Sequence, residues 1–180
     1  MNNTFAKLIL SFLTVFTCVN LAPSQGLCEF SSNGAPLLLN LRPGMSSEQV
    51  QSALGKSPKV KVKKDGERIF FQSYAEKSAP TALKNVNAFY LRFFDRQLYQ
   101  IEVFYNTEPD LSSLELITQS LSNQLNFPLE NWQIKNNRAA ANCDEHSLKA
   151  DNILNSHIEL TDETVRRKVE AIRKRDQSKK

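Results

Sequence analysis

Residues 41–55, L-R-P-G-M-S-S-E-Q-V-Q-S-A-L-G, predict a short, well-punctuated helix. Ser46 can cap it, and Gln49 stands three residues later, so the two side chains can form a capping box. Gly55 supplies a left-handed stop. The predicted apolar face consists of Val50, Ala53 and Leu54. A helix this short needs a larger apolar surface to pack on.

That surface is predicted by the strand patterns that follow the helix. Aromatic and β-branched residues fill 69–75, 88–94 and 98–105. The last two runs are joined by residues 95–97, a connection short enough for a hairpin. Alternation places one set of large side chains on a common face: Leu91, Phe93, Ile101, Val103 and Tyr105.

A second helix start repeats the first one 66 residues later, with Ser112 and Glu115 in the places of Ser46 and Gln49. Its apolar stripe is Leu114, Ile117, Leu121 and Leu125. Weaker strand patterns follow at 132–134, 139–143, 147–150 and 157–160. We therefore expect an α+β fold with short helices packed on an antiparallel sheet, built as a two-copy pseudo-repeat of residues 41–105 and 107–160.

The N-terminus has the layout of a secretory signal peptide. Lys7 precedes an apolar run over 8–22, and small residues near 22–26 suit signal peptidase at either of two sites. The apolar run is too short to span a bilayer, so cleavage is favoured over a membrane anchor. A lipid anchor is disfavoured, because neither Cys18 nor Cys28 follows a small residue. Residues 1–26 are the predicted signal and 27–162 a single domain.

Cysteine usage agrees with export to the periplasm or the exterior. Cys18 leaves with the signal, so the mature chain keeps Cys28 and Cys143. An even pair in an oxidising compartment is most simply a disulfide bond.

The positive charge is concentrated at the C-terminus. Residues 163–180 carry eight Lys or Arg against three Asp or Glu. A thin apolar stripe predicts a basic helix that rests lightly on the domain, or that projects from it and frays towards Lys180. Two interpretations stay open, a solvated tail and a surface that binds anionic lipid or lipopolysaccharide. The candidate binding residues are Arg166, Arg167, Lys168, Arg173, Lys174 and Arg175.

Exposed aromatic side chains on the sheet are candidate anchors for another protein. The members expected to point outward are Tyr90, Phe94, Tyr99 and Phe104.

The sequence offers little support for chemistry. Cys143, His146 and His157 can be written as a metal cluster, but a structural zinc site normally takes four ligands, and Cys143 is better used in a disulfide. Glu159 and Asp162 form a carboxylate pair, yet Asp162 is more simply a helix cap. We expect no metal, no cofactor and no specific nucleic acid partner, while an enzyme with an unrecognised site stays an alternative.

Residues 41–105 resemble the BamE, or SmpA/OmlA, family of small bacterial envelope proteins, through the G-M-S-S-E-Q-V-Q-S-A-L-G helix start and the hairpin L-R-F-F-D-R-Q-L-Y-Q-I-E-V. Two such units in tandem resemble the β-lactamase inhibitor protein architecture. The family's lipid-anchor motif is absent, and the basic helix is not part of the family pattern. The resemblance implies a non-enzymatic binding module of the cell envelope, of assembly or inhibitor type, that holds another envelope or secreted protein by a sheet face or edge.

Overall fold

The computed structural model describes residues 38–55, 60–74, 83, 85–106, 112–125, 127–143, 145–153 and 155–179. The predicted signal peptide and Cys28 lie outside these residues. The helices are α1 (Ser47–Leu54), α2 (Leu114–Leu125), the short 3-10 helix η4 (Leu129–Asn131) and α3 (Glu163–Gln177). The strands are β1 (Val60–Val62), β2 (Arg68–Ser73), β3 (Val86–Phe94), β4 (Gln97–Tyr105), β5 (Gln133–Lys135), β6 (Arg138–Cys143), β7 (His146–Asn152) and β8 (Ser156–Asp162).

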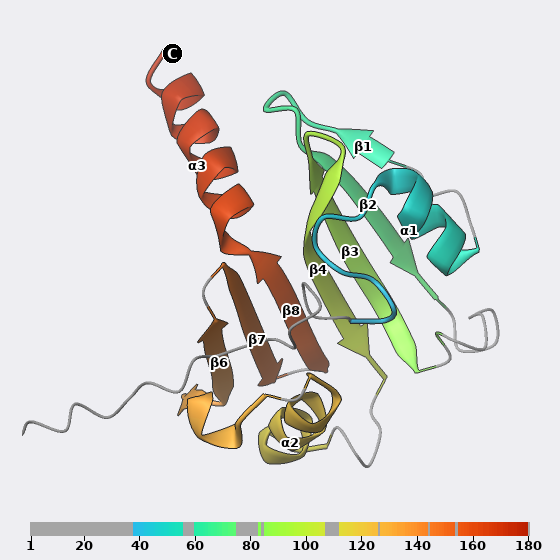
Figure 1. Cartoon of the computed structure of the whole chain (residues 1–180), viewed down its shortest axis with the longest axis vertical. Coiled ribbons are helices and arrows are strands. Elements are labelled where there is room, and N and C mark those ends of the chain that lie inside the picture. The colour runs from blue at the N-terminus through green and yellow to red at the C-terminus, as the bar shows by residue number, and fades with distance from the viewer. Residues whose placement is uncertain are drawn as a thin grey trace, which may run out of the picture.

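The eight strands form one antiparallel sheet in the order β1-β2-β3-β4-β8-β7-β6-β5. The first four strands make one meander and the last four make another, and their final strands, β4 and β8, pair in the middle (Figure 1). Each meander is preceded by a helix, α1 or α2. The predicted α+β class is confirmed, and the order of the elements matches the predicted two-copy arrangement.

The first helix begins and ends where the sequence predicts. The Ser46 hydroxyl accepts a hydrogen bond from the Gln49 N–H at 3.3 Å, and the Gln49 side chain accepts one from the Ser46 N–H at 2.8 Å. Gly55 ends the helix with a φ of 67°. Val50 is buried but Ala53 is exposed, because so short a helix touches the core along a single line.

The start of α2 differs from the prediction by one residue. The Ser113 hydroxyl, not Ser112, accepts a hydrogen bond from the third helical N–H, that of Leu116, at 3.3 Å. Ser112 is held outside the helix, since its carbonyl accepts a bond from the Asn152 side chain at 2.7 Å. The predicted apolar stripe is confirmed, with Leu114, Ile117 and Leu121 buried and Leu125 packed against the core.

The core lies between the sheet and the helices α1 and α2. Both helices contribute to one cluster with the inward residues of the strands, which include Phe70, Phe89, Leu91, Phe93, Ile101, Val103, Leu148, Ala150, Ile158 and Leu160. Because the two helices share this cluster, they cover the same face of the sheet. The opposite face carries neither of them.

The helix α3 follows β8 directly and extends past the strand ends (Figure 1). Asp162 caps it by accepting a bond from the Val165 N–H at 2.9 Å. The helix packs on β4, β7 and β8, and Val169 is buried.

The apolar contact of this helix with the sheet is as narrow as predicted, with Val169 as the buried residue, but ion pairs reinforce it. Arg173 lies 2.7 Å from Asp65 and 2.6 Å from Glu67, both in the turn between β1 and β2. The apolar stripe is thin, as expected, but ion pairs formed by the basic residues themselves fix the helix, and these depend on contacts distant in sequence.

Candidate functional site

Side chains that point away from α1 and α2 form a second face of the sheet, which we call the open face. The strand register arranges them in rows that cross the strands. One row is Phe71, Tyr90, Glu102, Glu159, Lys149 and Ala140. The next row is Ser73, Ala88, Phe104, His157, Asp151 and Arg138.

Four rings on the open face touch in sequence and form what we call the aromatic ladder: Phe71, Tyr90, Phe104 and His157. Phe71 stacks on Tyr90, and Phe104 stacks on His157, each with ring centroids 4.5 Å apart. Tyr90 meets Phe104 edge-on at 6.0 Å. The ladder gives the open face an apolar strip that crosses from β2 through β3 and β4 to β8.

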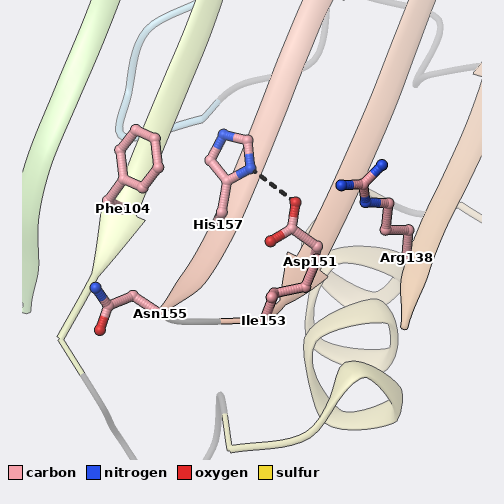
Figure 2. Close-up of a pocket in the computed structure, with 6 residues that line it drawn as sticks. All are labelled: Phe104, Arg138, Asp151, Ile153, Asn155 and His157. Carbon is pink, nitrogen blue, oxygen red and sulfur yellow. Dashed lines mark hydrogen bonds and ion pairs between the residues drawn. The ribbon is translucent and has the colours of Figure 1, made fainter. Parts of the chain in front are cut away.

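A pocket of about 340 Å³ lies where the ladder ends at β8, lined by Phe104, Arg138, Asp151, Ile153, Asn155 and His157. Figure 2 shows Phe104, His157, Asp151 and Arg138 on neighbouring strands and Ile153 and Asn155 at the connection between β7 and β8, with the His157 ring beside the Asp151 carboxylate. The two groups are 3.1 Å apart, from Nδ1 to Oδ2. Because an ionised carboxylate can only accept, we assign the hydrogen to Nδ1, which donates it to Asp151.

His157 and Asp151 are the residue types of an acid-base dyad, but a substrate cannot reach the ring nitrogen that would take part in catalysis. The other ring nitrogen, Nε2, is buried and has no hydrogen-bond partner among the described residues. A general base must reach the proton it removes. The lining of this pocket also contains no Ser, Thr or Cys side chain. The arrangement is therefore suited to holding a ligand with Asp151 and Arg138 rather than to activating one.

Some charged side chains on the open face form ion pairs and others do not. Two ion pairs join neighbouring strands: Arg92 with Glu102 at 3.3 Å, and Lys149 with Glu159 at 2.7 Å. Arg138 and its cross-strand neighbour Lys135 are exposed, and no described carboxylate lies within 4.0 Å of either cation. The end of the open face at β5 and β6 thus carries unpaired positive charge.

A fully buried carboxylate, Glu67, lies under α3. It forms ion pairs with Arg173 at 2.6 Å, Lys63 at 3.4 Å and Arg92 at 3.7 Å. It also accepts a short hydrogen bond from the Tyr99 hydroxyl. Burial, together with the neighbouring Glu67 charge, raises the pKa of Tyr99 well above its usual range.

Asp65 completes this network. Burial alone acts to raise the pKa of Asp65, but hydrogen bonds from Arg173 and from the Glu67 N–H outweigh it and hold that pKa below its usual range. The hydrogen bond that Arg173 donates to Asp65 also raises the pKa of Arg173. Both shifts reflect how far the hydrogen bond and the attraction between Asp65 and Arg173 favour the charged forms, and this pair attaches α3 to the first half of the sheet.

The predicted outward aromatic residues separate into two groups. Tyr90 and Phe104 belong to the aromatic ladder, and Phe94 is half-buried at the end of β3. Tyr99 is only 2% exposed, so its assignment to an exposed binding surface is wrong. A register shift, in which Phe93 pairs with Leu98, leaves Tyr99 as an extra residue, and its hydroxyl donates a hydrogen bond to the buried Glu67 under α3.

The structure adds site residues that the sequence interpretation did not single out, namely Phe71, Arg138 and Asp151. Their shared place on the open face depends on the pairing of β7 with β6 and β8, which lie far from β2 in the chain. The only local signal was Phe71 within the aromatic run at 69–75.

The basic residues of α3 are only partly free. Arg166 pairs with Glu163 at 2.6 Å and also with Glu170, while Arg173 is engaged with Asp65 and Glu67. These ion pairs leave the two arginines less charge to offer an anionic surface, so their predicted role in binding stays a prediction. The remaining predicted members are exposed: Arg167, Lys168, Lys174 and Arg175.

The three residues considered as a possible metal cluster, Cys143, His146 and His157, do not lie together. Cys143 and His146 pair across the β6–β7 turn, whereas His157 pairs with Asp151 further along the sheet. Among the described residues, no three His, Cys, Asp or Glu side chains are placed to hold a metal ion. Glu159 binds Lys149 rather than Asp162. Cys143 is buried, and because Cys28 lies outside the described residues, the Cys28–Cys143 disulfide stays a prediction.

Comparison with protein-family models, with curated proteins and with solved structures finds no match. The resemblance of residues 41–105 to the BamE family therefore stays a prediction. Within the described part of the chain, no helix is both long enough and apolar enough to span a bilayer.

Proposed function

We propose that this protein is an exported, non-enzymatic binding module of the bacterial cell envelope that holds another protein on the open face of its sheet. The observation that carries the proposal is the aromatic ladder. Phe71 remains 46% exposed although it stacks on Tyr90, and the ladder continues into a pocket beside Phe104 and His157. Aromatic side chains next to a concave pocket are typical anchors of protein interfaces.

The charge of the face indicates the chemistry of the partner. Among the described residues, no carboxylate forms an ion pair with Lys135 or Arg138, and Arg138 also lines the pocket. The complementary partner is a folded protein with a loop that lays an apolar or aromatic side chain on the ladder and directs a carboxylate towards β6. A carboxylate accepts two hydrogen bonds from one guanidinium, which fixes the position of the loop.

The enzyme alternative has less support at this site. The pocket gathers four polar side chains. The sequence suggests four candidate polar residues for a catalytic pocket, and only His157 lines this one. The other three candidates are His146, Glu159 and Asp162. The free nitrogen of His157 is buried.

Site-specific photo-crosslinking in the cells that export the protein tests the proposal. A photoreactive phenylalanine analogue replaces Phe71 in one variant and Leu116 in a matched control, because the two residues are 46% and 41% exposed but lie on the open face and on α2 respectively. We expect one discrete protein adduct from position 71 and none from position 116. Adding Phe104→Ala should remove that adduct, and its crosslinked peptide should contain Asp or Glu. Equal adducts from both positions, or no adduct from position 71, would overturn the proposal.

A further inference from the structure

The charged residues of α3 lie on three different sides of the helix: inner, flanking and outer. Its inner side carries the buried Val169 together with Arg173, which binds Asp65 and Glu67. Along one flank, Arg166 pairs with Glu163 and with Glu170. Two of the three acidic residues of the helix are therefore neutralised on that flank.

The outer side of α3 carries a set of cations that we call the cationic stripe: Arg167, Lys168, Lys174 and Arg175. At 100° per residue they fall within an arc of about 120° and span about 12 Å along the axis. All four residues are exposed, and Lys179 is also exposed, in the turn that follows the helix. Arg167 donates a hydrogen bond to the Glu163 carbonyl at 3.0 Å, and Arg175 approaches Asp176 at 3.9 Å. Neither contact neutralises the stripe, which keeps its positive charge.

The orientation of this stripe is fixed rather than averaged by motion of a loose tail. The cap at Asp162, the Ser147–Glu163 hydrogen bond at 2.6 Å and the Arg173 ion pairs hold the helix on the sheet. Four cations are thus presented together on one side of the helix.

We propose that the cationic stripe binds the headgroup surface of anionic phospholipid membranes. The stripe contains no large apolar side chain, so the helix lies on the surface by charge attraction without insertion. It also contains no aromatic side chain on which nucleobases can stack, which favours a lipid surface over single-stranded nucleic acid. This surface is separate from the open face, so the two binding activities can be tested independently.

Co-sedimentation of the mature chain with lipid vesicles tests this inference. The vesicles contain phosphatidylcholine alone or with about one-third phosphatidylglycerol, at low salt and at about 150 mM salt. The test variant is Lys168→Gln/Lys174→Gln/Arg175→Gln. The control, Lys61→Gln/Arg68→Gln/Arg96→Gln, removes equal charge from exposed positions outside α3. Unchanged thermal unfolding of both variants shows that the fold is intact.

The wild-type chain should bind the anionic vesicles only, and less at the higher salt. The test variant should bind about 100-fold more weakly, at roughly five-fold per cation lost, and the control less than about five-fold more weakly. Equal weakening of both variants would overturn the proposal, as would binding of the wild-type chain that does not depend on phosphatidylglycerol. Tighter binding of a DNA duplex than of the vesicles at about 150 mM salt would replace the lipid surface with nucleic acid.

Discussion

A single buried carboxylate connects parts of the protein that are far apart in sequence. Glu67 is fully buried and pairs with Arg92 in the first half of the sheet and with Arg173 in α3. A buried charge is tolerated only where partners compensate it, so this residue needs the whole network to be formed.

Replacing Glu67 by Gln should therefore destabilise the fold markedly. The change leaves the positive groups of Arg92 and Arg173 without their shared partner, and we expect the free energy of unfolding to fall by about 2–3 kcal/mol. This is less than the roughly 3–5 kcal/mol of a fully buried pair, because both arginines keep contact with water. Urea unfolding measures it, with Glu130→Gln, an exposed carboxylate on η4, as the control that changes stability by less than about 0.5 kcal/mol. Equal midpoints for the two variants would contradict a structural role for the network.

At the scale of elements, α3 is a structural part of the domain despite its charge. Truncation after Asp162 removes the buried Val169 and the Arg173 pairs, and it uncovers Glu67. We expect Tm to fall by about 10 °C, since about 4 kcal/mol is lost and each kcal/mol corresponds to roughly 2–4 °C in a chain of this size. Calorimetry of the truncated chain checks this, with Lys174→Gln/Arg175→Gln as a control that leaves Tm unchanged. A truncated chain that melts within about 2 °C of the full one would restore the simple-tail interpretation.

Local sequence patterns predict most of the helices and strands, whereas contacts between distant residues determine how their side chains are used. The Ser46 capping box, Gly55 and the stripe of α2 are properties of neighbouring residues, so the sequence predicts them well. The inward direction of Leu91 and Ile101 follows from strand alternation. A bulge breaks that alternation without a local signal.

The candidate site was less accessible to prediction for the same reason. The turn of Tyr99 towards Glu67 depends on a register shift between β3 and β4. The meeting of Phe104, His157 and Arg138 depends on β4 pairing with β8 across the centre of the sheet. The two strands are about 50 residues apart in the chain. A site formed where they pair therefore cannot be predicted from the pattern of neighbouring residues.

At the scale of the whole molecule, the seam between β4 and β8 makes two similar halves into one folding unit. Ile101 and Val103 on β4 lie in register with Leu160 and Ile158 on β8, and all four side chains are buried in the single core. The ion pair between Glu67 and Arg173 also crosses from one half to the other. Either half on its own would expose an apolar strand edge, and the first half would also lose Arg173, one of the partners of its buried carboxylate Glu67.

Fragments 27–106 and 107–180 should therefore fold only together. Each is small enough that its own core is marginal, and separation leaves β4 or β8, which pair with each other in the full sheet, at an unpaired edge. We expect neither fragment alone to show a cooperative thermal transition, and a mixture to recover one together with the near-ultraviolet circular dichroism of the full chain. Ile101→Asp, a fully buried seam position, should prevent this complementation, whereas Ile134→Asp, 54% exposed on the edge strand β5, should allow it. Cooperative unfolding of either fragment by itself would mean that the pseudo-repeats are independent domains that happen to share a sheet.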